Sequence, residues 1–306
     1  MMFRNAQIYR LPTPWVIDKC TLADALARKH LRECGALDCE TRGFVVPRPD
    51  ADDSHVYACG GHWHIRYGAE TRILPAAVIQ DETTKRADAL AQQQGYKLGR
   101  KQLKELREQI TTELMPRAFT RRRYTDAWVD PEGGWLVIDA PSTARAEDVL
   151  EQLRQALDRF PLTVLRTERS PMSAMADWLA GNEAPAGFTI DRDCELRSVT
   201  EDGASVRYAH HSLEGDEVKG HLEAGKLPRK LAMTYGDRVS FVLTEQGGIK
   251  RLDYLDILHE DLRAAGAEDA SALADAEWAL MTGELSKLIS ALIGAMGGEL
   301  RSESVV

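Results

Sequence analysis

The chain has 306 residues and a formal net charge of −9, and 43% of its residues are hydrophobic and 28% are charged. This length allows two domains, or one domain with a sizeable insertion, and the composition is ordinary for a globular protein. The overall acidity excludes a protein that coats nucleic acid with its whole surface, so a nucleic-acid site has to be a confined basic patch. The N-terminus lacks the apolar segment of a secretory signal, and no run of about 18 apolar residues predicts a membrane-spanning helix. Five cysteines without paired spacing predict free thiols in a reducing cytoplasm.

The first half of the chain predicts strands that pair mainly as hairpins. Strands are expected at 3–11, 43–46, 55–59, 63–67, 118–130, 135–139 and 163–165, with Gly60-Gly61 as one hairpin turn. A short helix is expected at 21–28, with Thr21 as its cap, and another at 143–157, capped by Ser142. Between 76 and 115 a long helical stretch is interrupted at Gly95 and Gly99, which predicts two helices.

The second half predicts a similar mixture. Strands are expected at 188–191, 194–199, 204–208, 227–235, 238–244 and 249–254, and helices at 172–179 and 214–223. A helical stripe from Leu280 to Met296 stops at Gly297-Gly298. We therefore expect an α+β fold with mixed, mostly antiparallel sheets. We place an N-terminal α+β region at 1–165, with a basic helical tip inserted at about 76–125, and a C-terminal α+β region at 166–306.

The most informative segment is basic and runs from Lys97 to Arg123. Residues 85–123 hold eleven basic and four acidic side chains, a net charge of +7 on an acidic protein. An apolar stripe of leucine and isoleucine predicts an amphipathic helix, which Pro116 ends. The stripe consists of Leu103, Leu106, Ile110 and Leu114. The basic residues beside it are Lys97, Arg100, Lys101, Lys104 and Arg107, and Arg117, Arg121, Arg122 and Arg123 follow the helix.

This segment has two interpretations, a solvated helix face and a phosphate-binding surface. We favour phosphate binding because the charge opposes that of the chain, acidic partners are few, and the arginines continue past the helix end. A second basic cluster, Lys226, Arg229 and Lys230, lies in the C-terminal region, with Lys250-Arg251 across the hairpin. Phe119, between the arginines, is either a core residue entering a strand or an exposed anchor for a partner chain, and the sequence leaves both open.

Motifs for catalysis are missing from the sequence. There is no glycine-rich phosphate loop, no nucleophile elbow and no zinc-protease motif. His62 and His64 share one face of a predicted strand, but no third ligand follows at a recognised spacing, so we interpret them as surface histidines. His210-His211 is a poor ligand pair, and the aspartates at 50, 52 and 53 are expected in a solvated loop. We predict no catalytic residue, no metal ligand and no cofactor.

Short motifs along the whole chain resemble those of one family. They are Phe3, Asn5 and Tyr9-Arg10-Leu11, then 70–75 (ETRILP), 114–119 (LMPRAF), 146–150 (AEDVL), Asp177-Trp178, 194–203, 221–226 (HLEAGK), 250–252 and 280–299. In this order and number they are similar to the motifs of the bacterial recombination-associated protein RdgC family.

The resemblance implies a horseshoe-shaped protomer that pairs with a second copy into a closed ring, with duplex DNA passing through a positively lined hole. It implies a non-enzymatic DNA-binding protein of the cytoplasm and nucleoid that restrains RecA-promoted recombination and is associated with replication restart. On the matching motif, Arg117 and Phe119 fall at the tip where protomers meet. Many relatives carry lysines where this chain has 209–212 (AHHS), so the contribution of that loop to DNA binding is left open, with pH dependence as one alternative.

Two other classes of function remain as alternatives. One is a DNA-processing enzyme, such as a metal-dependent nuclease, that uses the scattered carboxylates and histidines. The other is an interaction module that binds the recombinase directly. The basic residues fit sequence-independent duplex binding best, because such binding requires cations facing phosphates and no base-reading helix.

Overall fold

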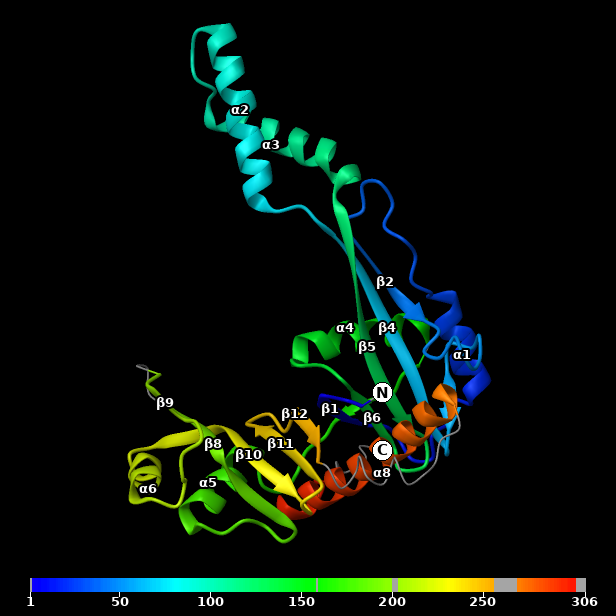
Figure 1. Ribbon diagram of the computed structural model, residues 1–306, viewed down its shortest axis with the longest axis vertical. Helices are drawn as coiled ribbons and strands as arrows, with labels where there is room; N and C mark the ends of the chain where they lie inside the picture. The colour runs from blue at the N-terminus through cyan, green and yellow to red at the C-terminus, as the bar shows by residue number, and fades with distance from the viewer. Residues whose placement is uncertain (1, 158, 200–202, 256–268, 301–306) are drawn as a thin grey trace.

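The computed structural model describes residues 2–157, 159–199, 203–255 and 269–300 (Figure 1). Its α-helices in these ranges are α1 (Lys19–Arg28), α2 (Ala76–Gln94), α3 (Arg100–Leu114), α4 (Thr143–Ala156), α5 (Pro171–Gly181), α6 (Asp216–Glu223) and α8 (Ala270–Ala295). A short 3-10 helix, η1 (Met115–Arg117), follows α3. The strands are β1 (Asn5–Arg10), β2 (Glu40–Val45), β3 (Tyr57–Cys59), β4 (His62–Ile73), β5 (Phe119–Asp130), β6 (Trp135–Ile138), β7 (Thr163–Val164), β8 (Phe188–Ser198), β9 (Ser205–Tyr208), β10 (Lys226–Tyr235), β11 (Val239–Thr244) and β12 (Ile249–Tyr254).

The strands form one sheet of twelve. Its order is β2-β4-β5-β6-β1-β12-β11-β10-β8-β9, with β3 on β4 and β7 on β1. The α+β class is confirmed. Every pairing between these strands is antiparallel, where the sequence predicted mixed, mostly antiparallel sheets. Hairpins need only short turns, and the many glycine-containing turns of this chain allow them.

Strands β4 and β5 form a long arm that carries the helical tip. They pair without a break from Trp63↔Val129 to Ile73↔Phe119, and α2 and α3 are inserted between their distal ends. The tip has a small apolar cluster of its own, in which Ile79, Leu106 and Ile110 are buried. Leu103 was expected on the same stripe but is 37% exposed, because α2 covers only part of α3.

Two larger clusters lie on either side of the sheet. One includes the apolar faces of α1 and α4, and the other includes those of α5, α6 and α8. Alternate residues of β5 belong to different clusters, as Trp128 packs on the α8 side and Val129 on the α4 side. The sheet is therefore buried on both faces near its middle strands.

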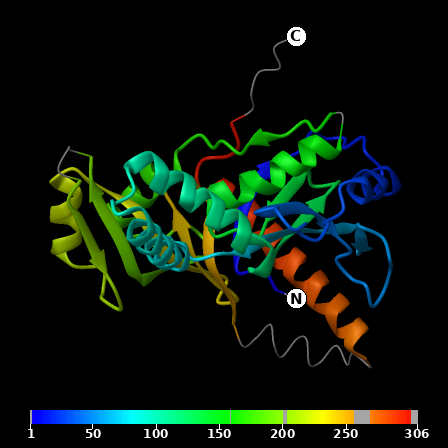
Figure 2. The ribbon, with the colours of Figure 1, turned by 90° about the horizontal axis from the view of Figure 1, so that it is seen from above.

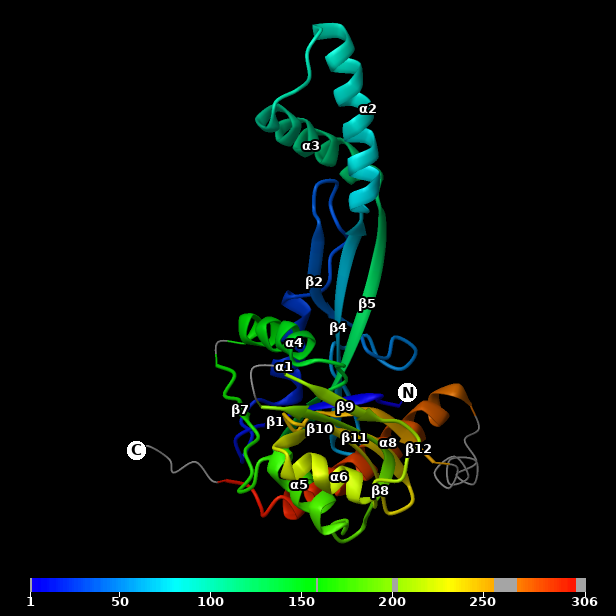
Figure 3. The same ribbon diagram turned by 90° about the vertical axis from the view of Figure 1, so that its left-hand side faces the viewer.

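The outline of the molecule is concave on one side. The tip and the end formed by α6 and β9 both project to the left of the arm in Figure 1. From above, the tip helices reach toward the C-terminal half of the sheet and away from α1 (Figure 2). Helices α5, α6 and α8 lie below that half of the sheet, on the side away from the tip (Figure 3). The face of β8, β10, β11 and β12 that these helices leave uncovered, called the base face below, is directed toward the tip.

Several element boundaries differ from those predicted. Asp18, and not Thr21, caps α1, since its carboxylate accepts the backbone N–H of Thr21 at 3.0 Å. Strand β8 is continuous where two strands were expected, because irregular register opposite β10 absorbs the break. Helix α8 begins ten residues before Leu280, at Ala270, where Asp269 caps it. The cap expected at Ser142 and the helix break expected at Gly95 are confirmed. No helix in the described ranges is long and apolar enough to cross a membrane.

Candidate nucleic-acid interface

Helix α3 presents its basic side chains to solvent. Lys101 and Lys104 are 91% and 79% exposed, and their carboxylate partners one turn later are 4.0 and 3.9 Å away. Ion pairs this exposed contribute little, so both ammonium groups remain accessible to an anion. Arg100 and Arg107 are also exposed on α3. Lys97 is exposed but lies in the loop before α3, because the helix begins only at Arg100.

Acidic residues of the tip are partly engaged in holding it together. The Arg86 guanidinium on α2 binds Glu82 at 2.8 Å and Glu113 on α3 at 2.6 Å. This side chain joins the two helices and binds one carboxylate on each of them. This pairing leaves the net charge of the tip unchanged and holds the two carboxylates at Arg86.

The three consecutive arginines of β5 divide between the two faces of the arm. Arg121 and Arg123 lie on the face that carries Thr125, where α4 covers the strand lower down. Both are exposed, and no carboxylate of the described residues lies within 4.0 Å of either. Arg122 points the other way and binds Glu70 at 2.7 Å and Glu33 at 3.1 Å. Its charge is offset there.

Glu70 explains why Arg122 is held. Its side chain is buried, and the Arg122 guanidinium keeps the pKa of this carboxyl below its usual range. The pair joins β5 to β4 across the register Glu70↔Arg122. A second residue of the same motif, Arg72, fixes the end of the tip. Its guanidinium donates to the carbonyls of Met115 and Ala118, each at 3.0 Å, and of Gly35 at 2.9 Å.

Arg117 and Phe119 project from the segment that Arg72 holds. Arg117 is exposed in η1, without an ion-pair partner among the described residues. Phe119 is 85% exposed, and its cross-strand neighbour Ile73 is 42% exposed. The interpretation of Phe119 as a core residue is therefore wrong. It shares a strand face with buried residues but lies beyond the end of the helices that cover them.

The second basic cluster is largely neutralised. The Lys230 ammonium binds Glu195 at 2.6 Å and lowers the pKa of that carboxyl, and Arg229 binds Glu245. The Lys226 ammonium lies 2.8 Å from Nδ1 of His221. The contact of Lys230 crosses from β10 to β8, that of Arg229 reaches the turn after β11, and that of Lys226 reaches back to α6. The first two are not visible in the spacing of the sequence. They leave this cluster with less free positive charge than the tip.

Other cations on the base face have fewer close carboxylates than this cluster and are more accessible to an anion. Lys250 on β12 has no carboxylate within 4.0 Å in the described part of the chain. Arg207 on β9 has none either, and Arg251 is 67% exposed with Asp193 at 3.8 Å. Sequence reasoning missed Arg207, because only the strand order brings it to the same face as Lys230, on the other side of Glu195. The two groups of free cations therefore lie on the tip and on the base face, across the concavity of Figure 1.

The histidines and aspartates considered for chemistry have structural partners. His64 is buried, not on the surface as predicted, because Trp278 of α8 packs on its ring with centroids 4.6 Å apart. Its Nε2 lies 2.8 Å from Asp126. Asp50 binds Arg48, and His210 and His211 lie in the loop after β9. Within the described ranges, no three His, Cys, Asp or Glu side chains are grouped so that they could hold a metal ion.

Comparison with known proteins adds the family. A family model described as "Putative exonuclease, RdgC" matches residues 1–299. The chain belongs to the RdgC family. A "Recombination-associated protein RdgC" from Dechloromonas aromatica is 53% identical over 304 residues, which cover 98% of this chain and 99% of that protein. RdgC proteins of the same description from Herminiimonas arsenicoxydans and Janthinobacterium sp. (strain Marseille) are 44% and 42% identical. They cover 98% and 99% of this chain and 99% and 100% of their own lengths.

Two RdgC motifs noted in the sequence come together at the base of the tip. Residues 70–75 supply Glu70 and Arg72, and residues 114–119 supply the carbonyls that Arg72 binds. The first motif therefore supports the second and aims Arg117 and Phe119 outward. The role of Arg117 and Phe119 at the end of the arm depends on the molecule that they contact there.

Proposed function

We propose that this chain is a sequence-independent double-stranded DNA-binding protein, without catalytic activity of its own, that restrains RecA-promoted recombination in the bacterial cytoplasm and nucleoid. The observation that carries the proposal is the set of exposed guanidinium groups at Arg117, Arg121 and Arg123. None has a carboxylate partner among the described residues. Membership of a family whose relatives are named recombination-associated supports the role in recombination.

The arrangement of these cations suits phosphates better than bases. The cations of the tip lie on the arm and on the side of α3, and the cations of the base face lie on a broad sheet surface. Contacts of this type neutralise phosphates and release counterions, and they carry no sequence information. Duplex DNA lying in the concavity would meet the tip on one side and the base face on the other.

A second copy of the chain completes the proposal. The concave protomer corresponds to half of a ring, and a two-fold axis would repeat both basic groups around one hole. Phe119 is the residue we propose at the contact between tips, since an aromatic side chain 85% exposed among arginines is stabilised by burial against a partner. The division into regions 1–165 and 166–306 remains a proposal, as does the role of each cation.

The description of the family model favours one second candidate, an exonuclease. Both candidates bind duplex DNA, and they differ in what happens to it afterwards. Incubation of end-labelled linear duplex with the protein and Mg²⁺ or Mn²⁺ separates them. Intact ends after prolonged incubation support the binding protein, and progressive loss of terminal nucleotides supports the exonuclease.

The salt dependence of duplex binding tests the proposed interface. The logarithm of the binding constant should fall linearly with the logarithm of the salt concentration, by about 0.9 for each neutralised phosphate. Replacing Lys101 and Lys104 with alanine should reduce the slope by up to about 1.8. The matched control replaces Arg28 and Lys29, two exposed cations at the end of α1, and should leave the slope unchanged.

An unchanged slope in the Lys101 and Lys104 variant would move the DNA site away from α3. The same variant tests the third candidate, a module that binds the recombinase directly. Such a module would still inhibit RecA-promoted strand exchange after the cations are removed. A DNA-binding ring would lose inhibition in proportion to its lost affinity for DNA.

A further inference from the structure

The sheet has a gap on one side of β1. Residues Asn5 and Ala6 pair with β12, and Tyr9 and Arg10 pair with β7. Between them, residues 7 and 8 pair only with β6 among the described strands. The turn between β11 and β12 and the end of β7 therefore diverge at the centre of the sheet and leave an opening.

A cavity of about 720 Å³ occupies this opening. Its wall is mostly apolar and comes from β1, β7, β11 and the last turns of α8. The apolar lining includes Ile8, Leu165, Leu243, Ile289, Leu292 and Met296, and the charged residues Glu147, Arg166 and Glu168 also line the cavity. The volume lies within the range of about 300–1,000 Å³ that is typical of small-molecule sites.

A smaller cavity of about 270 Å³ adjoins it on the base face. This one is polar and is lined by Lys230, Lys250 and Arg229, with the hydroxyl-bearing start of α4. Glu195 and Glu245 also line it, but they bind Lys230 and Arg229, so the Lys250 ammonium remains unpaired among the described residues. The two cavities share three lining residues, Gln7, Thr143 and Gln246.

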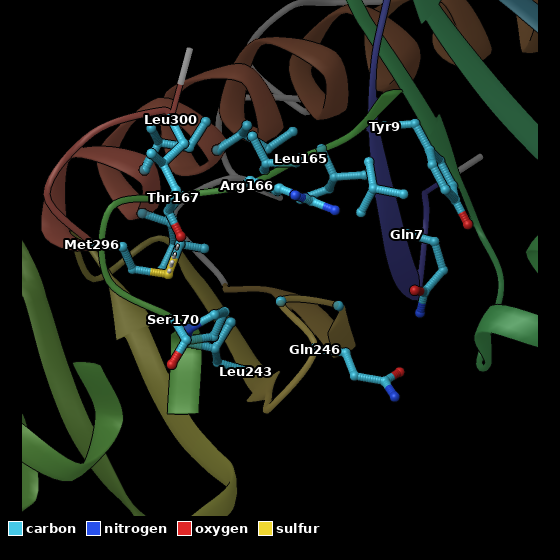
Figure 4. Close-up of a pocket in the computed structure, with 18 of the residues that line it drawn as sticks. Gln7, Tyr9, Leu165, Arg166, Thr167, Ser170, Leu243, Gln246, Met296 and Leu300 are labelled. Carbon is cyan, nitrogen blue, oxygen red and sulfur yellow. Dashed lines mark hydrogen bonds between the residues drawn. The ribbon is translucent and has the colours of Figure 1, made fainter. Parts of the chain in front are cut away.

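Two carboxamides stand where the cavities meet. Figure 4 shows those of Gln7 and Gln246 at one end of the large cavity, with Met296 and Leu300 at the other. Gln7 is 6% exposed, and its amide nitrogen donates to the carbonyl of Ala140 at 3.4 Å. Its Oε1 and the side chain of Gln246 have no hydrogen-bond partner in the described part of the chain. A Cβ at position 248 would lie 2.9 Å from Nε2 of Gln7, so glycine there makes room for this carboxamide.

We propose that the paired cavities bind one unpaired nucleotide, with its phosphate beside Lys250 and its base in the apolar cavity against the carboxamides of Gln7 and Gln246. A carboxamide offers a donor and an acceptor side by side, which is the pattern that base edges pair with. An apolar wall favours the faces of a base that has left its stack. The inference rests on the proposed function, because it places the site on the face where the duplex would lie. The nucleotide belongs either to DNA or to the free pool, and the test distinguishes the two.

The experiment compares two duplexes that differ only in one 2-aminopurine, which is either paired or bulged out of the helix. We expect the full-length protein to bind the bulged duplex at least fivefold more tightly, with a change in 2-aminopurine fluorescence. Gln246→Ala should reduce this preference to less than twofold, and Leu165→Trp, which fills the cavity, should abolish it. Neither should change affinity for the paired duplex. Gln155→Ala, an exposed glutamine on α4 outside both cavities, is the matched control.

Equal affinity for the two duplexes, together with no saturable binding of the free nucleotide described below, would overturn the inference, and so would a preference that both variants retain. Failure to bind the paired duplex at all would instead refute the proposed function. A further arm uses 2-aminopurine deoxyribonucleoside monophosphate alone. Saturable binding that Gln246→Ala weakens would support the site and assign its nucleotide to the free pool.

Discussion

Replacing Phe119 with alanine is the most direct test of the proposed contact between the ends of two arms. Full burial of a phenylalanine side chain is worth about 1.5–3 kcal/mol. Because Phe119 is 85% exposed, burial within the protomer accounts for only about 0.2–0.5 kcal/mol of that. The free energy of unfolding should therefore change little. If a second tip covers the ring, about 1.3–2.6 kcal/mol remains for closure, which corresponds to a factor of about 10–80.

The assay measures retention of the variant on closed circular and on linear duplex after a high-salt wash. Retention on the closed circle should fall, because topological trapping requires a shut ring. Binding to linear duplex at low salt should persist, because Arg117, Arg121 and Arg123 remain. Tyr124→Ala, half exposed on the opposite face of β5, is the control and should keep its retention. Unchanged retention of the Phe119 variant, or a loss of more than about 1 kcal/mol in unfolding free energy, would refute the reasoning.

Four further variants test the placement of single side chains. Arg122→Ala should lower stability, because the buried Glu70 carboxylate loses its guanidinium partner, and should weaken DNA binding little. Arg121→Ala should instead weaken DNA binding and change stability little. Equal effects of the two variants in urea unfolding and in DNA titration would contradict the assignment of Arg121 and Arg122 to opposite faces of the arm. Leu288→Ala should cost about 2–5 kcal/mol in urea unfolding, since the side chain is fully buried on α8, and dimer dissociation with stability intact would place it at an interface instead. Burial lowers the pKa of His64, so the unfolded chain binds more protons as the pH falls below about 6.5, and stability should decrease there. His64→Gln should flatten that decrease below about pH 6.5, and an identical slope would assign it to other groups.

Local features of the fold could be predicted from the sequence because they depend on neighbouring residues. The cap at Ser142, the break at Gly95 and the hairpin at Gly60-Gly61 follow from backbone preferences within a few positions. The error at Thr21 is of the same kind, since Asp18 three residues earlier is an equally good cap and the apolar pattern does not distinguish them. The α+β class followed from the hairpin spacing.

Features that depend on distant segments could not be predicted. Arg122 is neutralised by Glu70 because of the register of β4 against β5, and nothing in the run of three arginines singles out the middle one. His64 is buried because α8, more than two hundred residues later, packs on its ring. The exposure of Phe119 depends on where the covering helices end. The individual DNA contacts, the pairing of tips and the boundary at 165 remain predictions.

The length of the arm has a mechanical consequence. From Asp130 to Phe119 the strand extends roughly 35–40 Å, at about 3.3 Å per residue. The arm therefore acts as a lever, and a rotation of about 10° at its foot would displace Phe119 by about 6 Å, at the same rise per residue. Arg72 makes the tip turn with the arm, because it fastens the carbonyls on both sides of η1 to the end of β4. A displacement of that size is larger than the separation of two side chains in contact, so it would break a contact made by Phe119. Small changes in packing where β5 and β6 meet α8 would thus decide whether two such levers touch.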